Sequence, residues 1–174
     1  SGTWNEALMN GAHRILAKAV DPGSRSEAIV VSFGSEWYDS LRGRRFTAVI
    51  RKRVPASIQP RWLYFHINSP KSAICARAEI RAVEMIDRSS ALQMWRELDL
   101  SEEQILNYFG GQASIGCYRL GEILYPDSDV AGEQISAHMV YYAPQSFFVL
   151  SKDAKELLDR LCGFKQDVLA TRKG

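Results

Sequence analysis

The sequence has few of the residues that build disulfide frameworks or metal centres. It holds three cysteines, Cys75, Cys117 and Cys162, which lie far apart, and three histidines without a metal-ligand partner at helical spacing. Neither set matches a disulfide framework or a zinc-ligand spacing, so we expect no metal and no other cofactor. Free cysteines indicate a reducing compartment, and we expect the cytoplasm.

Long apolar runs and nucleotide-binding loops are also missing. The longest apolar runs have four to six residues, far fewer than the roughly 20 that a bilayer-spanning helix needs, so we expect no membrane partner. The glycine patterns that cradle a triphosphate or a dinucleotide do not occur, nor does the elbow of a serine hydrolase. The chain starts at Ser1 without a methionine, which suggests a fragment of a longer protein or the remnant of a tag.

The 174 residues predict one compact domain with terminal extensions. Apolar residues at helical spacing predict a helix over 4–20, and Ser151 is placed to cap a final helix. Between them, strands gather around two short helices, over 90–98 and 101–109, without alternating strand–helix units. Ser101 and Gln104 predict a capping box for the second of these helices, which stops at Gly110, and Ser35 is placed to cap a brief helix that ends near Gly43. Strands are expected over 45–53 and, from period-two alternation, over 73–86, and an irregular stretch is expected between 124 and 146. This order indicates an α+β fold, a small mixed and mostly antiparallel barrel with short flanking helices. We therefore divide the chain into an N-terminal helical extension (1–25), a barrel domain (26–151) and a C-terminal helix with its tail (152–174).

Positive charge is concentrated in one part of the chain. Residues 40–78 hold nine of the 22 basic residues and none of the 20 acidic ones, although the net charge is only +2. Such a block is typical of a surface that binds a polyanion, and Tyr64 and His66 in the same block are candidates to stack on a base. A solvated basic face above core aromatics is the alternative.

The strongest candidate for a site is the segment 41–53, in which a short helix ends at Gly43 and leads into a strand. Strand alternation puts Arg45, Thr47, Val49 and Arg51 on one face and Phe46, Ala48 and Ile50 on the other. Arginine forks suit phosphate oxygens, and the Thr47 hydroxyl completes an anion site.

These motifs together resemble those of the ASCH domain family, which has the PUA-like fold and includes bacterial and archaeal proteins described as predicted transcriptional regulators. The resemblance covers about residues 28–150 and rests on a turn, a glycine followed by basic residues, a Trp helix, a Tyr-Phe-Gly helix and a Pro-Gln-Ser-Phe ending. These are found at Ser32–Ser35, Gly43–Arg45, Met94–Trp95, Tyr108–Gly110 and Pro144–Phe147.

The resemblance implies a cleft that binds RNA or a modified or single-stranded nucleotide, with RNA favoured over DNA. The expected nucleic-acid-binding residues are Arg44, Arg45, Thr47, Arg51, Arg53, Tyr64, His66, Ser69, Lys71, Gln145 and Ser146, of which Ser69, Gln145 and Ser146 come from the resemblance. Some relatives hydrolyse N4-acetylcytidine or are proposed to cut RNA, which gives Arg45, Thr47 and Glu97 as catalytic candidates. Arg45 stands where those enzymes have a lysine that can release its proton, so we expect binding without catalysis.

Two alternatives stay open. The first is a hydrolase that acts on a modified nucleoside or on RNA. The second is a protein-interaction or coregulator module, in which the terminal helices around Trp4 and Leu157 contact a neighbouring domain or partner.

Overall fold

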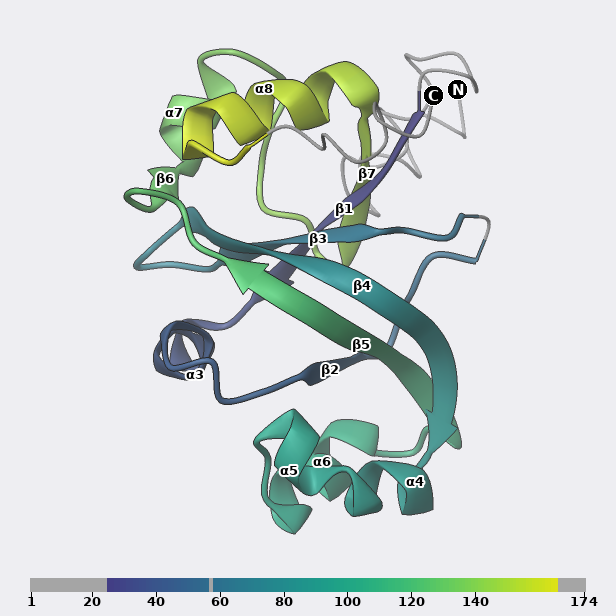
Figure 1. Ribbon diagram of the computed structural model, residues 1–174. Coiled ribbons are helices and arrows are strands. Elements are labelled where there is room, and N and C mark those ends of the chain that lie inside the picture. Colours follow the sequence, from purple (N-terminus) through teal and green to yellow (C-terminus); the bar gives the residue numbers. More distant parts are fainter. Residues whose placement is uncertain (1–24, 57, 166–174) are drawn as a thin grey trace.

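A computed structural model describes residues 25–56 and 58–165 (Figure 1). Its strands are β1 (Arg25–Phe33), β2 (Ala48–Arg51), β3 (Trp62–Ile67), β4 (Ala73–Asp87), β5 (Ser114–Leu124), β6 (Val130–Ala131) and β7 (Phe147–Ser151). Its helices are the 3-10 turn η2 (Ser35–Trp37), α3 (Tyr38–Arg42), α4 (Arg88–Gln93), α5 (Trp95–Leu98), α6 (Glu102–Phe109), α7 (Gly132–Ser136) and α8 (Lys152–Cys162). None of these helices is long and apolar enough to cross a bilayer. The helix expected over 4–20 lies outside the described residues.

The strands form one mixed sheet in the order β2-β5-β4-β3-β1-β7, with β6 paired to β4. Only β1 and β3 run parallel, and every other pair is antiparallel. This confirms the predicted α+β class with a mostly antiparallel, barrel-like sheet.

Strand β4 gives the sheet its curvature. Its first half pairs with β3, and its pairing with β5 shifts register twice between Ala78 and Ala82. Register shifts of this kind bend a strand and increase its twist. Figure 1 shows β4 turning sharply as it leaves the barrel and runs toward α4.

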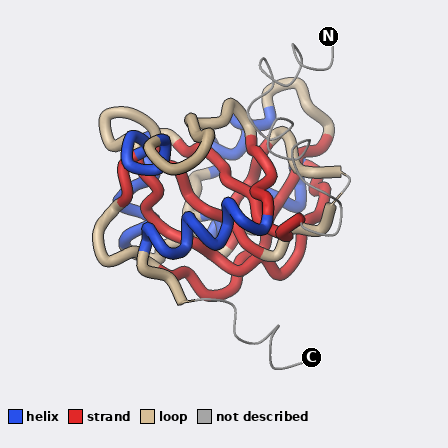
Figure 2. The backbone as a smooth tube through the Cα atoms, turned by 90° about the horizontal axis from the view of Figure 1, so that it is seen from above, coloured by secondary structure: helices blue, strands red, loops and turns tan. Residues whose placement is uncertain are grey.

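Apolar side chains form three clusters around the sheet. The barrel interior is filled by Phe33, Phe65 and Tyr118, among others. Helices α4, α5 and α6 cover the outer face of β2 and β5 through residues such as Phe109. At the opposite end, α8 packs on β1 and β7, and Figure 2 shows it lying across the strands.

Strand β2 differs from the prediction because both of its faces are buried. Val49 points into the barrel, while Ala48 and Ile50 contact the helical layer. The strand is also shorter than the expected 45–53. Period-two alternation shows which residues share a face, but whether each face is covered depends on elements that are distant in sequence.

The helix ends agree only partly with the sequence analysis. The capping box of Ser101 and Gln104 and the cap of Ser151 are confirmed. Ser35 does not cap its helix, since Gly34 occupies that position without a side-chain bond. The helix expected over 90–98 is interrupted at Met94, which leaves α4 and α5. Strand β6 and helix α7 lie where an irregular stretch was expected.

Helix α8 is anchored by a buried carboxylate. Asp159 is 1% exposed and accepts a hydrogen bond from the Tyr64 hydroxyl. The Lys155 ammonium lies 2.8 Å and an Arg77 nitrogen 3.3 Å from its two oxygens. The carboxylate thereby joins the C-terminal helix to the strands β3 and β4.

Candidate nucleic-acid interface

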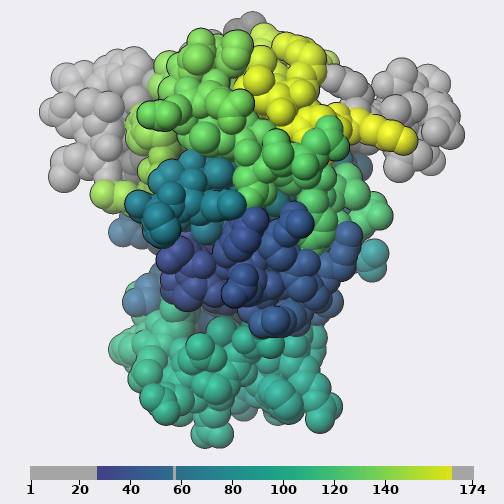
Figure 3. Space-filling model, turned by 90° about the vertical axis from the view of Figure 1, so that its left-hand side faces the viewer, coloured from purple at the N-terminus to yellow at the C-terminus, as the bar shows by residue number. Residues whose placement is uncertain are grey.

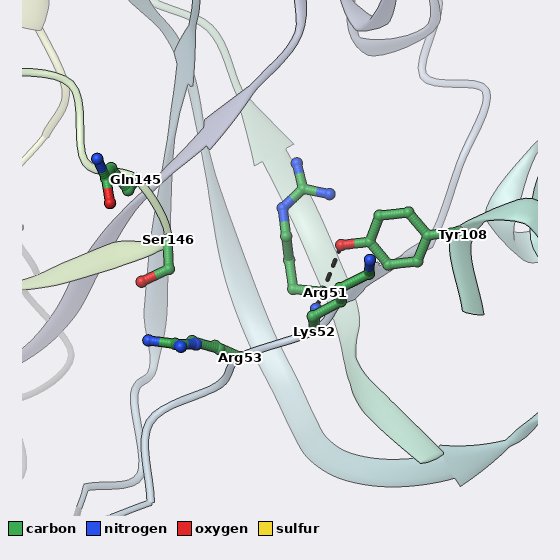
Figure 4. Close-up of a pocket in the computed structure, with 6 residues that line it drawn as sticks. All are labelled: Arg51, Lys52, Arg53, Tyr108, Gln145 and Ser146. Atoms are coloured by element: carbon green, nitrogen blue, oxygen red, sulfur yellow. Dashed lines mark hydrogen bonds between the residues drawn. The ribbon is translucent and has the colours of Figure 1, made fainter. Parts of the chain in front are cut away.

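A basic hollow opens where β2 ends (Figure 4). It measures about 340 Å³ and is lined by Arg51, Lys52, Arg53, Tyr108, Gln145 and Ser146. The three cations are consecutive, Tyr108 comes from α6, and Gln145 and Ser146 come from the segment before β7. We call this site the basic hollow. Among the described residues, its lining contains no carboxylate, so its electrostatic character is cationic.

Arg51 lies on the inner side of this hollow and is held by uncharged partners. Its guanidinium donates to the carbonyl oxygens of Ser32 at 2.9 Å and Ile50 at 3.0 Å, and it stacks 3.8 Å from the centre of the Phe33 ring. Burial lowers the pKa of Arg51, which opposes its charge, although an arginine stays protonated at neutral pH. It forms no ion pair with a carboxylate of the described chain. A half-buried cation without a carboxylate partner favours an incoming anion.

Two polar groups around Arg51 lack hydrogen-bond partners. The Ser32 hydroxyl and the Tyr118 hydroxyl are buried and unpartnered within the described structure. Burial also raises the pKa of Tyr118, which stays neutral. Buried polar atoms are normally satisfied by protein or by ordered water. The surroundings of Arg51 are therefore polar, which is unusual for the inside of a small barrel.

Tyr108 forms the wall of the basic hollow opposite Gln145 (Figure 4). Its hydroxyl accepts from the Lys52 backbone N–H at 3.2 Å, and the Lys52 ammonium lies 5.5 Å from its ring centre. The ring is half-buried. Neither residue was among the predicted binding residues. Strand alternation assigns Lys52 to the face opposite to that of Arg51, so it was not predicted to bind. Tyr108 lies 56 positions away from Lys52 in sequence.

A second hollow adjoins the first, between α3 and the helical layer. It measures about 210 Å³ and shares Arg51 and Tyr108 with the basic hollow. Its other lining residues are Glu36, Trp37, Ser40, Ile50, Asp99, Leu100 and Gln104. We call it the acidic hollow. Figure 3 shows the segment around α3, in dark blue, directly above helices α4–α6, in teal.

The structure brings together four of the predicted binding residues and separates the others. Arg51, Arg53, Gln145 and Ser146 line the basic hollow. Arg44 instead stacks 4.7 Å from the Tyr125 ring centre and donates to the Ile123 carbonyl oxygen at 2.8 Å. That arginine therefore has a structural role away from the basic hollow.

The catalytic candidates lie at the surface outside both hollows. Arg45, Thr47 and Glu97 are all exposed. Their only hydrogen bond to one another is between backbones, from the Thr47 N–H to the Glu97 carbonyl oxygen at 2.8 Å. This contact positions β2 against α5 and places no side chains of the three in a common pocket of the described structure.

Tyr64 and His66 are not accessible to a base. Tyr64 is fully buried, and its hydroxyl is bonded to Asp159. His66 is 3% exposed, with its Nδ1 2.6 Å from the Tyr141 hydroxyl, and burial lowers its pKa to about 4. The expectation that either ring stacks on a base therefore needs correction, since β3 is a central strand with both faces covered.

Ser69 and Lys71 lie in the exposed turn between β3 and β4. Lys71 is already paired, with its ammonium 2.9 Å from an Asp129 oxygen and 4.5 Å from the Tyr38 ring centre. Tyr38 donates to the same carboxylate at 2.8 Å. Neither Ser69 nor Lys71 lines the basic hollow.

We also searched the described part of the chain for candidate metal ligands. No group of three or more histidine, cysteine, aspartate or glutamate side chains is arranged to hold an ion there. Burial raises the pKa of the cysteine thiols, to about 12 for Cys75 and Cys162 and about 11 for Cys117. These thiols are therefore packing groups rather than nucleophiles.

No family model and no curated protein matches the chain. Solved structures do match. The ASCH protein of Zymomonas mobilis aligns with a TM-score of 0.71 at 20% identity, over 80% of this chain and 99% of the other. A serine-to-alanine mutant of that protein gives 0.71 at 20% identity over 79% and 98% of the two chains.

A tyrosine-to-phenylalanine mutant of the same Zymomonas mobilis protein gives a TM-score of 0.70 at 21% identity, over 78% of this chain and 98% of the other. The likeness extends over almost the whole length of these proteins. The chain therefore has the fold of the ASCH domain proteins, as the resemblance in its sequence predicts.

Proposed function

We propose that the chain binds RNA or a modified or single-stranded nucleotide in the basic hollow, without catalysis of its own. The observation that carries the proposal is Arg51, a half-buried arginine without a carboxylate partner in the described structure, followed by two exposed cations. Arginine forks hold phosphate oxygens in a bidentate manner, and a lysine adds a point charge.

A single strand fits this site better than a duplex does. The hollow has a volume of about 340 Å³, which is within the range of pockets that hold small organic ligands. The half-buried Tyr108 ring forms one of its walls and provides a face for base stacking, which requires an unpaired base.

RNA is favoured over DNA because of the uncharged side of the hollow. Gln145 and Ser146 line the side of the hollow away from Arg51 and Tyr108 (Figure 4), and they offer hydrogen-bond donors and acceptors to a 2′-hydroxyl. Because both residues are uncharged, they contribute to the preference for RNA over DNA and do not strengthen the binding of phosphates in general.

Binding is favoured over hydrolysis by the nature of the lining. The described lining of the basic hollow includes no histidine and no carboxylate beside the proposed phosphate positions, and the adjoining hollow adds two exposed carboxylates, Glu36 and Asp99, but no histidine and no lysine. The alternative catalytic set of Arg45, Thr47 and Glu97 lies outside it. Incubation with RNA and with N4-acetylcytidine, followed by product analysis, is expected to show no turnover.

The direct test is fluorescence anisotropy with matched single-stranded RNA, single-stranded DNA and duplex. We expect the order of affinity to be single-stranded RNA, then single-stranded DNA, then duplex. The Lys52→Ala/Arg53→Ala variant is expected to lose most of the binding. It retains the fold, because both side chains are exposed and the Lys52 backbone bond to Tyr108 persists.

The matched control is Arg81→Ala/Arg160→Ala, which removes the same charge from exposed positions outside the hollow. It is expected to bind nearly as well as the parent. Equal losses in both variants would show that binding follows net charge and not the hollow, and an absence of binding to all three probes would overturn the proposal.

A further inference from the structure

The two adjoining hollows have opposite electrostatic character. The basic hollow has three cations and no acid in its described lining, whereas the acidic hollow adds Glu36 and Asp99 to the shared Arg51. Arg51 and Tyr108 line both, so a ligand that passes these two residues moves from a cationic to an anionic surface. A plain polyanion does not fit this arrangement, since its phosphates are repelled from the second hollow.

The acidic hollow is rich in hydrogen-bond acceptors. Glu36 is exposed and makes no ion pair with a described cation. One oxygen of Asp99 accepts from the Ser40 hydroxyl at 3.0 Å, which orients the carboxylate and leaves its other oxygen free of a side-chain partner. Ionised carboxylates accept hydrogen bonds and cannot donate them. A group placed here must therefore supply N–H or O–H donors.

The walls of the acidic hollow suit a flat ring. Trp37 and Tyr108 are half-buried, and Leu100 and Ile50 add apolar surface. The volume of about 210 Å³ is below the usual range for a whole drug-sized ligand and suits one ring system. Bases stack on aromatic side chains because every base has a π-face.

We infer that one nucleotide of a bound strand spans both hollows, with its phosphate at Arg51, the phosphates of its neighbours at Lys52 and Arg53, and an amino-bearing base beside Glu36 and Asp99. The inference rests on the proposed nucleic-acid binding and adds the class of base. Cytosine, adenine and guanine each carry an exocyclic amino group that can donate to the carboxylates, and cytosine and adenine carry it without a neighbouring carbonyl oxygen at the six-membered ring position that guanine's O6 occupies. Uracil has only one N–H, placed between two carbonyl oxygens, and these oxygens are repelled by the carboxylates. The site therefore selects amino-bearing bases against uracil.

The test compares four labelled hexamers by anisotropy at one salt concentration: oligocytidine, oligoadenosine, oligouridine and an abasic strand. The first two are expected to bind about tenfold more tightly than oligouridine, which is the usual size of a base-edge discrimination. The abasic strand is expected to bind as weakly as oligouridine, because it has only phosphates to offer.

The variant that isolates the acidic hollow is Glu36→Gln/Asp99→Asn. Both replacements keep the size of the side chain, and asparagine tolerates the left-handed backbone of Asp99. This variant is expected to bind the three base-bearing strands with affinities within about twofold of one another, since an amide offers both donors and acceptors. The abasic strand stays weaker, because it has no base to stack on Trp37 and Tyr108. Glu102→Gln/Glu103→Gln removes the same charge from exposed positions outside both hollows and is expected to keep the preference.

The outcomes separate this inference from the proposed function. Equal affinity of the parent for all four hexamers would overturn the inference and leave nucleic-acid binding intact. A preference that survives in Glu36→Gln/Asp99→Asn would also overturn it, because the carboxylates would then not be its cause. If none of the hexamers binds, the proposed function fails and the inference fails with it.

Discussion

The salt dependence of RNA binding is the sharpest prediction from the basic hollow. Three cations line it, Arg51, Lys52 and Arg53, and each is placed to neutralise one phosphate. Each neutralised phosphate of a single strand contributes about −0.7 to the slope of log K against log salt. The parent is therefore expected to show a slope of about −2, which corresponds to an affinity loss of about 18-fold between 50 and 200 mM salt.

Removal of the two exposed cations leaves Arg51 alone. The Lys52→Ala/Arg53→Ala variant is then expected to have a slope of about −0.7, with a loss of only about 2.6-fold over the same range. The assay is anisotropy of a labelled single-stranded RNA at five or more salt concentrations. Circular dichroism of the variant serves as the control for folding. A slope that stays near −2 in the variant would refute the reasoning, because the phosphates would then be bound elsewhere.

Three further predictions concern stability. Asp159→Ala is expected to lower the unfolding free energy by about 3–5 kcal/mol in urea titrations, because it leaves buried cations without their carboxylate; a loss below about 1 kcal/mol would contradict the buried network. Burial lowers the pKa of His66 from 6.5 to about 4, so the unfolded chain binds the proton first as the pH falls, and stability is lost between pH 6.5 and 4. This loss is about 3 kcal/mol, and a His66→Gln variant that retains it would show that other groups cause it. Gly110 has φ +52° and ψ −121°, so Gly110→Ala is expected to lower the unfolding free energy by about 1–3 kcal/mol. Gly111→Ala at the next position is expected to lower it by less than about 0.5 kcal/mol. Similar melting temperatures for the two variants in thermal unfolding would argue against backbone strain at Gly110.

The local features of the chain follow closely from its sequence. The capping box of Ser101 and the stop at Gly110 depend on residues within one turn of each other. The long strand β4 was predicted from period-two alternation over 73–86 and is observed over Ala73–Asp87. Such features are set by short-range hydrogen bonding and by the direction in which neighbouring side chains point.

Only some of the residues that line the basic hollow could be predicted from the sequence. Arg51 and Arg53 were found because the charge block is visible along the chain, and Gln145 and Ser146 came from the family resemblance. Lys52 was passed over, because alternation assigned it to the opposite side of a strand that in fact ends at Arg51. Tyr108 was missed because its contact with Lys52 joins segments that are far apart.

Sequence by itself determined the α+β class, the resemblance to the ASCH fold, the excess of positive charge over 40–78 and the ends of the best-capped helices. Only the tertiary structure decided which of those charges are available. It buried Tyr64 and His66 in a central strand, stacked Arg44 on Tyr125, and left Arg51 half-buried between two hollows of opposite sign. The physical reason is that charge and propensity belong to single residues and short segments, whereas burial and pairing depend on which distant elements cover each face of the sheet.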